Sequence, residues 1–350
     1  MSGPLKFFIR SLIFLLIVTG SAGGAFFYFF LHTNGETETS DVIIQRGMSL
    51  TQVANTLHKN GIIQYPKLFK HVLSFTQGSS KVRAGEFRFK RGMSLKHALF
   101  VLYEGEPIVH QVTIPEGWTL RQIAALLASS QLVEEKKFLD LTLSSNTAKQ
   151  YQFAAPSLEG YLFPDTYAFS RIDGEEKIIE RMVQRFRQKF ANEFASEIQS
   201  KGWTLERLVT LASIIEKETG SQGERELISS VFHNRLKKKM RLQSDPTTIY
   251  GIENFNGNLT KADLQRFTPY NTYTINELPP GAIANPGYDS LVAALRPATT
   301  NYLFFVANNQ GGHLFSETYS KHAKLVNDYQ KSPTARNLGR RAATTISPRK

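Results

Sequence analysis

The feature that most constrains this chain is an apolar segment near its beginning, residues 11–31, which contains no charged residue. Its length matches the roughly 20 residues that an α-helix needs to cross the hydrocarbon core of a bilayer. Lys6 and Arg10 precede the segment, and acidic residues follow it from Glu36 onward. By the positive-inside rule we expect a single-pass protein of the inner (cytoplasmic) membrane, with a cytoplasmic amino terminus and the remaining chain outside the cytoplasm.

A cleaved signal peptide is the alternative interpretation of this segment. The small residues at 21–25 (SAGGA) are of the kind that a signal peptidase cuts after. However, the aromatic run at 26–31 extends the apolar stretch beyond the about 7–15 residues typical of a signal peptide. The length therefore favours an uncleaved anchor, with residues 1–10 cytoplasmic, 11–31 in the membrane and 32–40 as a polar linker.

The net charge of +12, from 42 Lys and Arg against 30 Asp and Glu, is concentrated at the two ends of the chain. More than half of it comes from Lys6, Arg10, Arg336, Arg340, Arg341, Arg349 and Lys350. The body is only mildly basic, which argues against nucleic acid as the main partner and suits an anionic membrane surface or polymer. No cysteine is present, so disulfides and thiolate metal sites are excluded. We expect the basic tail, residues 332–350, to be disordered.

A strand–turn–helix pattern occurs three times between residues 41 and 130. Each copy places a glycine two residues before Ser49, Ser94 or Thr119, and a leucine and further apolar residues at helical spacing follow. The pattern predicts strands at 42–44, 87–89 and 109–114 that leave through a glycine turn into a helix capped by the hydroxyl residue. It resembles the LysM type of glycan-binding module, most clearly over 41–104, although capped helices after strands also occur in other α/β domains.

The remaining chain predicts an α+β fold, with a mixed helical and loop-rich domain at 131–331. Helices are expected at 134–149, 174–201, 205–219, 224–239, 289–295 and 318–330, and a strand at 302–306. Thr204 is positioned to cap the helix at 205–219, and Gly220 to end it. After Gln243 we expect mostly loop.

The helix at 205–219 carries two acidic residues, Glu216 and Glu218, on opposite shoulders of its apolar stripe. Periodicity nominates both as candidate catalytic carboxyls and does not choose between them. Glu218 lies closer to the helix end, where unpaired carbonyls raise the pKa of a carboxyl and favour the protonated form that a general acid needs. The alternative is an ordinary solvated helix end.

Five motifs in this order resemble the YceG-like family of membrane-anchored endolytic murein transglycosylases: IIEKET at 214–219, VFHNRL at 231–236, MRLQSDPTTIY at 240–250, YNTYT at 270–274 and LPPGAIANPG at 278–287. The resemblance extends over essentially the whole chain except the basic tail. It implies that Glu218, the second glutamate of the first motif, is the catalytic acid. The implied reaction cleaves the β-1,4 bond between N-acetylmuramic acid and N-acetylglucosamine without water, leaving 1,6-anhydromuramic ends and terminating glycan elongation.

In that reaction the C6 hydroxyl of the muramic acid attacks its own anomeric carbon, so one carboxyl, Glu218, acts first as acid and then as base. The resemblance implies no cofactor. It implies peptidoglycan glycan strands, the cytoplasmic membrane and peptidoglycan synthases (penicillin-binding proteins) as partners. Among the polar loop residues, we expect five to bind substrate: Asp165, Gln243, Asp245, Asn271 and Tyr273. Ordinary turns and Asx hydrogen bonds are the alternative for several of them.

Other polar residues are predicted to have structural roles. Asn234 and Arg235 should pack or brace a carboxylate rather than touch sugar, and Glu216 should pair with Arg225 or Arg235. His233 and His313 lack the spacing of paired metal ligands, so we predict no metal site. Two other functions stay open from the sequence: a non-catalytic peptidoglycan-binding protein and a scaffold for cell-wall synthesis.

Overall fold

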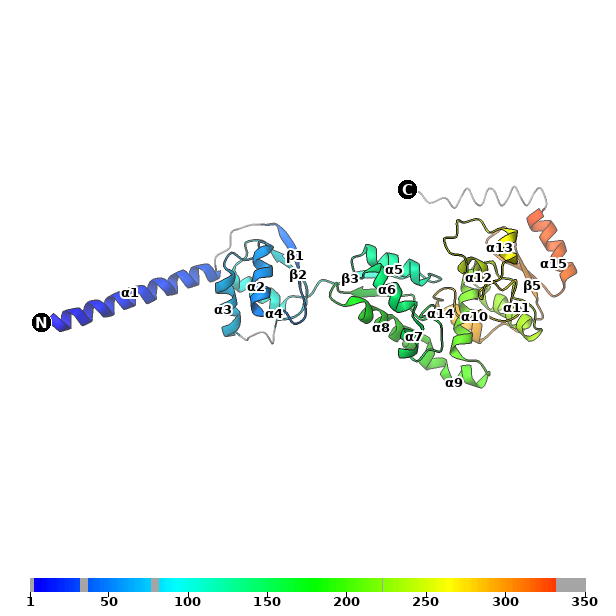
Figure 1. The fold of residues 1–350 in the computed structure, drawn as a ribbon, viewed down its shortest axis with the longest axis horizontal. Helices are drawn as coiled ribbons and strands as arrows, with labels where there is room; N and C mark the ends of the chain where they lie inside the picture. The colour runs from blue at the N-terminus through cyan, green and yellow to red at the C-terminus, as the bar shows by residue number, and fades with distance from the viewer. Residues whose placement is uncertain (1–2, 32–36, 77–81, 222, 332–350) are drawn as a thin grey trace. The chain divides into compact units, whose positions relative to one another are not determined.

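The computed structural model describes residues 3–31, 37–76, 82–221 and 223–331 (Figure 1). The chain divides into two compact units, which we call unit 1 (1–111 and 168–174) and unit 2 (112–167 and 175–350). It passes from one unit to the other in β3 (His110–Thr113) and in β4 (Thr166–Phe169), which pair as a two-stranded sheet, and a third time at 174/175. The tail at 332–350 and most of the predicted linker lie outside the described residues.

Helix α1 (Gly3–Leu31) covers the apolar segment predicted from the sequence. Within it, Phe7–Tyr28 is long and apolar enough to cross a membrane, by length and composition. Residues 12–20 contain one hydroxyl side chain, that of Thr19. This hydroxyl donates to the carbonyls of Leu15 and Leu16 in the same helix, so it is satisfied without water. The expected apolar helix is therefore confirmed, and its place in a membrane stays a prediction.

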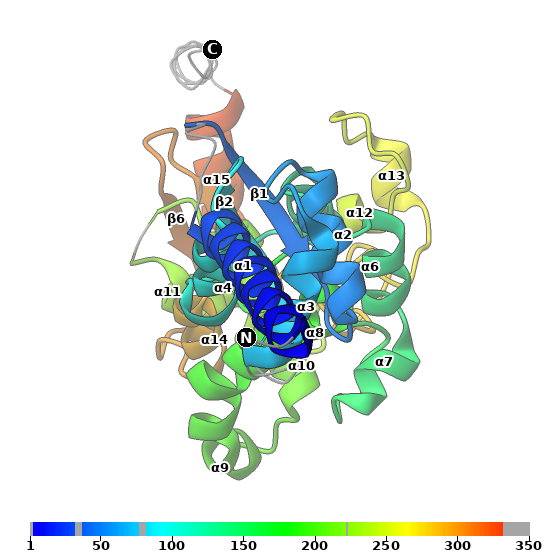
Figure 2. The ribbon, with the colours of Figure 1, turned by 90° about the vertical axis from the view of Figure 1, so that its left-hand side faces the viewer.

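The remainder of unit 1 runs β1 (Thr39–Ile44), α2 (Leu50–Lys59), α3 (Pro66–Thr76), β2 (Gly85–Lys90) and α4 (Leu95–Glu104). Strands β1 and β2 pair antiparallel with Val42 opposite Phe87, and α2 lies beside β1 (Figure 2). Alternate strand residues and the inner faces of the helices share one apolar core that includes Ile44, Leu57 and Phe69. The predicted strands are confirmed, while the resemblance to LysM modules stays a prediction.

All three predicted helix caps are present. The hydroxyls of Ser49, Ser94 and Thr119 accept the backbone N–H three residues ahead, at the starts of α2, α4 and α5 (Leu120–Ser129). Each preceding glycine (47, 92 and 117) has a positive φ, of 78°, 62° and 72°, which a side chain would strain. The third copy, α5, belongs to unit 2, so the structural division at 111/112 precedes the boundary at 130/131 predicted from the sequence.

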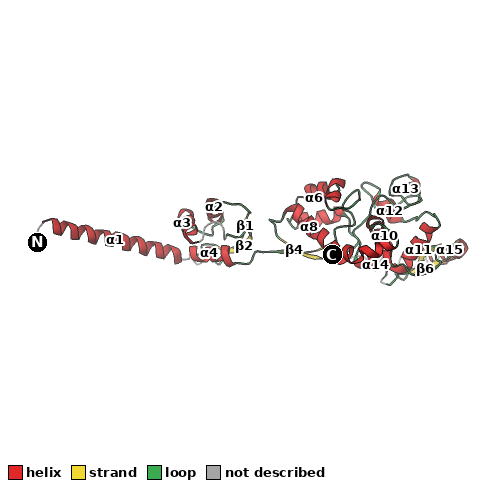
Figure 3. Cartoon of the chain, turned by 90° about the horizontal axis from the view of Figure 1, so that it is seen from below, coloured by secondary structure: helices red, strands yellow, loops and turns green. Residues whose placement is uncertain are grey.

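Unit 2 is mostly helical with short strands (Figure 3). After α5 come α6 (Glu135–Thr142), α7 (Ser145–Gln150), α8 (Gly174–Phe186), a π-helical turn (Arg187–Ala191), α9 (Asn192–Ser200), α10 (Leu205–Glu218), α11 (Arg225–Lys237), α12 (Asp245–Tyr250), α13 (Lys261–Gln265), α14 (Tyr288–Leu295), β5 (Phe304–Ala307), β6 (His313–Ser316), α15 (Tyr319–Val326) and a second π-helical turn (Asn327–Lys331). β5 and β6 form an antiparallel hairpin.

Several predicted elements are corrected by the structure. The helix expected at 134–149 is two helices, because Ser144 caps a new one at α7. The helix expected at 174–201 is interrupted by the π-helical turn. α10 ends at Glu218, and the residue after it, Thr219, is extended at φ −78°. Gly220 does not have a positive φ, so it does not end the helix as a glycine cap, as the sequence suggested. α12, α13 and β6 were not predicted.

Helix α10 forms the centre of unit 2. Its residues from Leu208 to Ile215 are all buried, and it packs against α14, α11 and α12. As predicted, the hydroxyl of Thr204 accepts the Arg207 N–H and caps its start. A side chain at Gly160 would place its Cβ 2.6 Å from Val209 on this helix, so only glycine allows the approach. The acidic residues of the last turn of α10 follow this buried stretch, at the edge of the core.

Candidate active site

Glu218, the last residue of α10, is half-buried next to the start of α12. The Ser244 hydroxyl donates a hydrogen bond of 2.5 Å to its Oε1. Burial raises the pKa of the Glu218 carboxyl, since taking a carboxylate out of water disfavours the charged form; the hydrogen bond from Ser244 opposes this and the negative charge of Asp245 adds to it. A buried carboxyl with a raised pKa suits a general acid.

Ser244 is at the position where serine usually caps a helix, yet its hydroxyl makes no capping bond to α12. Pro246, in the first turn of α12, has no N–H to be capped. The Ser244 hydroxyl therefore stays available for Glu218, while the Ser244 backbone N–H donates to the Thr272 hydroxyl. Sequence reasoning missed Ser244, although it lies between two residues that were predicted, Gln243 and Asp245.

Asp245 and Tyr273 lie together beside this acid. The Tyr273 hydroxyl donates to Asp245 Oδ1 over 2.6 Å, and burial together with that bond raises the pKa of Tyr273. Gln243 is exposed, with a left-handed backbone at φ 50°, and its N–H donates to the Thr272 carbonyl. A non-glycine residue in this conformation is uncommon and often marks a functional segment. The structure thus brings Gln243, Asp245 and Tyr273 near Glu218.

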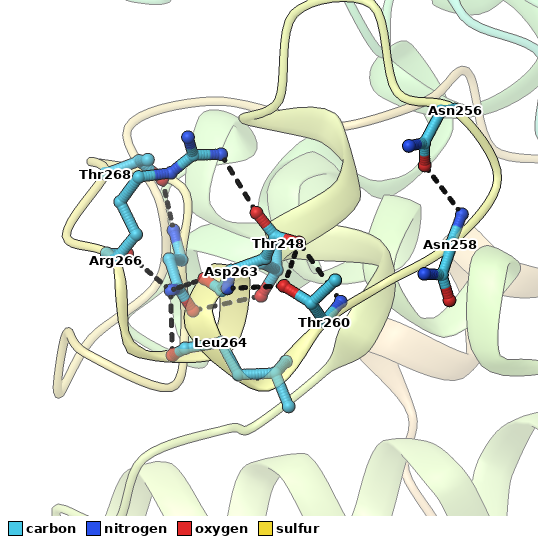
Figure 4. A network of polar contacts seen from close by, with 9 residues as sticks. Thr248, Asn256, Asn258, Thr260, Asp263, Leu264, Arg266 and Thr268 are labelled. Carbon is cyan, nitrogen blue, oxygen red and sulfur yellow. Dashed lines mark hydrogen bonds and ion pairs between the residues drawn. The ribbon is translucent and has the colours of Figure 1, made fainter.

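Asn271 has a different setting. It is fully buried, and its amide nitrogen donates to the carbonyls of Asp263, Leu264 and Arg266. Its amide oxygen accepts from the Thr248 hydroxyl and the Tyr273 N–H. The same segment is tied by Asp263, which bonds Thr260 and Arg266 (Figure 4). Every hydrogen-bonding group of the Asn271 amide is occupied by protein, so the geometry gives it a structural role rather than contact with sugar.

Asp165 also binds protein groups. Its carboxylate accepts from Arg185 Nε over 2.5 Å and from the Thr166 N–H over 2.8 Å. Among the contacts of the described residues, none joins Asp165 to Glu218. Its expected role in binding substrate stays a prediction without support from the geometry.

Asn234 and Arg235 brace backbone carbonyls, where a carboxylate was predicted as their partner. Asn234 donates its amide to the carbonyls of Thr300 and Tyr302. Arg235, 7% exposed, donates to the carbonyls of Leu303 and Leu242, the second just before Gln243. Its guanidinium therefore holds the segment that carries Ser244, and its charge lowers the pKa of Glu218 from a distance.

The two histidines have protein partners. His233 contacts the Ala294 carbonyl and lies against Trp203, and burial lowers its pKa. His313 pairs with Glu224 over 2.9 Å. Over the described part of the chain, no group of three acidic or histidine side chains is arranged to hold a metal ion.

Glu216, the other candidate catalytic carboxyl on α10, contacts a different set of residues from Glu218. Its carboxylate accepts the Gly287 N–H over 3.0 Å and lies 3.8 Å from Arg225, the first of the two cations predicted for it. Glu116 approaches the same arginine at 3.7 Å, and its pKa is raised by burial and by the charge of Glu216. The Glu216 carboxylate therefore faces a cation and a backbone donor, whereas the Glu218 carboxyl faces the Ser244 hydroxyl.

A fully buried carboxyl that sequence reasoning did not single out lies at Glu159. It accepts from the Leu120 N–H, the Tyr250 hydroxyl and the Asn285 amide, and burial raises its pKa to about 8. Asn285 in turn accepts the Gly160 and Leu162 N–H groups. This network joins α5 to α12, the helix that begins with Asp245.

The sequence and the fold of the chain are similar to those of known proteins. The sequence model of the YceG-like family matches residues 42–328. An endolytic murein transglycosylase of Bacillus subtilis is 33% identical, over 84% of this chain and 86% of the relative. One of Streptococcus pneumoniae is 29% identical, over 93% of this chain and 65% of the relative. The crystal structure of a yceG-like protein from Listeria monocytogenes superposes with a TM-score of 0.57 at 32% identity, over 82% of this chain and 99% of that one.

Proposed function

The chain belongs to the YceG-like family, and from that premise we propose that it is a peptidoglycan lytic transglycosylase that cuts within glycan strands. Its reaction cleaves the β-1,4 bond between N-acetylmuramic acid and N-acetylglucosamine and leaves 1,6-anhydromuramic ends. The observation that carries the proposal is the carboxyl of Glu218, with its pKa raised by burial and its bond to Ser244, close to the charge of Asp245 and to Tyr273.

One carboxyl is enough to carry out both proton transfers of this reaction. Protonated Glu218 donates its proton to the glycosidic oxygen, and the bond from that oxygen to the anomeric carbon of the muramic acid breaks. The C6 hydroxyl of the same sugar bonds to that carbon and closes the anhydro ring, while the Glu218 carboxylate takes up the hydroxyl proton. The acid is thereby regenerated without water.

The surroundings of Glu218 support both halves of this cycle. Burial favours the neutral acid before proton transfer. Once the proton has left, the Ser244 hydroxyl and the charge of Arg235 stabilise the carboxylate. A carboxyl whose charged form is disfavoured by burial and stabilised by a hydrogen bond can both give and retake a proton.

A hydrolase is the nearest alternative chemistry. A retaining glycosidase uses a second carboxylate about 5–5.5 Å from the first, and Asp245 is the neighbouring carboxylate here. Its bond to the Tyr273 hydroxyl occupies one of its oxygens, which favours a binding role. The chemistry of the product separates the two mechanisms, because hydrolysis leaves reducing muramic acid ends.

Localisation follows from α1 and the charges around it. We propose that α1 anchors the protein in the cytoplasmic membrane, with Lys6 and Arg10 inside and the chain after Leu31 outside. Unit 1, through its LysM-like repeats, would then hold glycan strands close to the membrane where they are made, within reach of peptidoglycan synthases.

The test is digestion of purified peptidoglycan by the full-length protein in detergent, followed by mass spectrometry. The wild type should release fragments with 1,6-anhydromuramic ends from internal as well as terminal bonds. Glu218→Gln should lose about 10²–10⁴-fold in rate, the usual contribution of a general acid, while keeping its fold and its binding to glycan.

Glu216→Gln is the matched control on the same helix, because its side chain faces Gly287 and Arg225. It should keep measurable activity, with any loss following its stability. If Glu216→Gln is inactive and Glu218→Gln active, the assignment is reversed. If wild type binds glycan and never cuts it, the protein is a peptidoglycan-binding or scaffold protein.

A further inference from the structure

A surface hollow of about 410 Å³ adjoins the proposed site in unit 2. It is lined by Arg241, Lys261, Leu264, Gln265, Tyr273 and Thr274. Tyr273 belongs to both places, since its ring borders the hollow and its hydroxyl donates to Asp245. A ligand bound over Glu218 could therefore extend a substituent into the hollow.

The lining of the hollow carries two cations and no carboxylate. Arg241 donates through Nε to the Asn276 side chain and through Nη1 to the Tyr273 carbonyl. These two bonds fix its guanidinium, and none of the hydrogen bonds made by the described residues uses its Nη2. Lys261 is exposed at the first position of α13, and its ammonium group has no ion pair within the described chain.

The nearest acidic residue on α13 does not neutralise Lys261. Asp263 accepts from the Thr260 hydroxyl and N–H and pairs with Arg266, which lowers its pKa and keeps its carboxylate occupied. The positive charge at the hollow is thus uncompensated, which favours an anionic ligand.

The walls of the hollow are fixed by a buried group. The Asn271 amide ties the 263–266 backbone, which includes the end of α13, to the segment that carries Tyr273. Because both walls depend on the same fully buried side chain, the spacing between Lys261 and Tyr273 is set before a ligand arrives. Preorganisation of this kind lowers the entropic cost of binding.

We propose that this hollow binds a carboxylate carried on the lactyl side chain of muramic acid while the glycan lies over Glu218. The inference rests on the proposed function. The sugar rings of a glycan strand are neutral, so the lactyl substituent bears the negative charge, either as its own carboxylate or through the carboxylates of an attached stem peptide. A cationic hollow beside the acid thus selects muramic acid over an uncharged sugar at the same position.

The experiment compares two soluble substrates with the full-length protein in detergent: glycan strands that carry stem peptides, and strands from which an amidase has removed them. Lys261→Gln should raise KM by about two- to fivefold, which corresponds to the ion pair of an exposed side chain, with kcat unchanged. Lys261→Arg should restore the wild-type KM. The matched control is Lys238→Gln, at an exposed lysine after α11, and its KM should equal that of the wild type.

The pattern across substrates identifies the source of the carboxylate. A KM effect confined to peptide-bearing strands assigns the hollow to the stem peptide, and one confined to trimmed strands assigns it to the lactyl group. If wild type and Lys261→Gln have equal KM values on both substrates, the inference about the hollow is wrong. Cleavage by the wild type in the same assay would still support the proposed function. A wild type that forms no anhydro ends on either substrate overturns both.

Discussion

Replacing the buried carboxyl of Glu159 by an amide should change how the stability of unit 2 depends on pH. Glu159→Gln keeps the shape of the side chain and an oxygen that accepts from the Leu120 N–H and the Asn285 amide, as the carboxyl does. It removes the ability to ionise. Any difference in pH dependence between wild type and variant therefore reports the ionisation of this one group.

The magnitude follows from the pKa values in the two states. Folding raises the pKa of Glu159 from an ordinary 4.5 to about 8, so between these values the folded protein holds a proton that the unfolded chain has released. Its stabilising contribution is complete below about pH 4.5 and is lost as pH rises through about 8. Because one pKa unit corresponds to about 1.4 kcal/mol, the total loss is about 5 kcal/mol. Relative to Glu159→Gln, the wild type should therefore become progressively less stable from pH 5 to pH 8.

Urea unfolding followed by tryptophan fluorescence measures this change selectively. Both tryptophans of the chain, Trp118 and Trp203, lie in unit 2, and the Trp118 carbonyl accepts from the Asn285 amide within the Glu159 network. Unfolding free energies of the full-length wild type and variant should be measured at intervals from pH 5 to pH 8. Other ionisable groups are common to both proteins and cancel in the difference.

Two results would refute the reasoning. Wild-type and Glu159→Gln stabilities that change in parallel with pH would show that Glu159 ionises in the folded protein as it does in water. A difference that grows in the opposite direction, with the wild type gaining stability as pH rises, would show that the hydrogen bonds from Leu120, Tyr250 and Asn285 outweigh burial and hold the carboxylate charged.

Three further outcomes are expected. Ser244→Ala removes the hydrogen bond that stabilises the Glu218 carboxylate, so the pKa of Glu218 should rise further and the alkaline limb of the pH–rate profile should move to higher pH; an unmoved limb would contradict it. Asn271→Asp loses the donor to three carbonyls and should cost about 2 kcal/mol or more at pH 7, seen in urea unfolding; wild-type stability would show these bonds to be weak. A reporter fused after Gln330 should be active only outside the cytoplasm, and a mature protein that starts near Ala25 would instead indicate a signal peptide.

Features that depend on neighbouring residues could be read from the sequence. An uncharged apolar run predicted α1, and the spacing of glycine and hydroxyl residues predicted the caps at Ser49, Ser94 and Thr119. Helical periodicity placed Glu216 and Glu218 at the edges of the apolar stripe. In each case the interaction spans a few residues, so the local chain contains all the information that the prediction needs.

The roles of the site residues were decided by contacts between distant parts of the chain. Periodicity alone treats Glu216 and Glu218 alike. The Gly287 N–H and Arg225 pair with the Glu216 carboxylate, whereas the Glu218 carboxyl receives the Ser244 hydroxyl. Asn271 was predicted to face the substrate, yet three carbonyls turn its amide inward. Burial and hydrogen-bond partners set a carboxyl's pKa, and these come from segments that only the folded chain brings together.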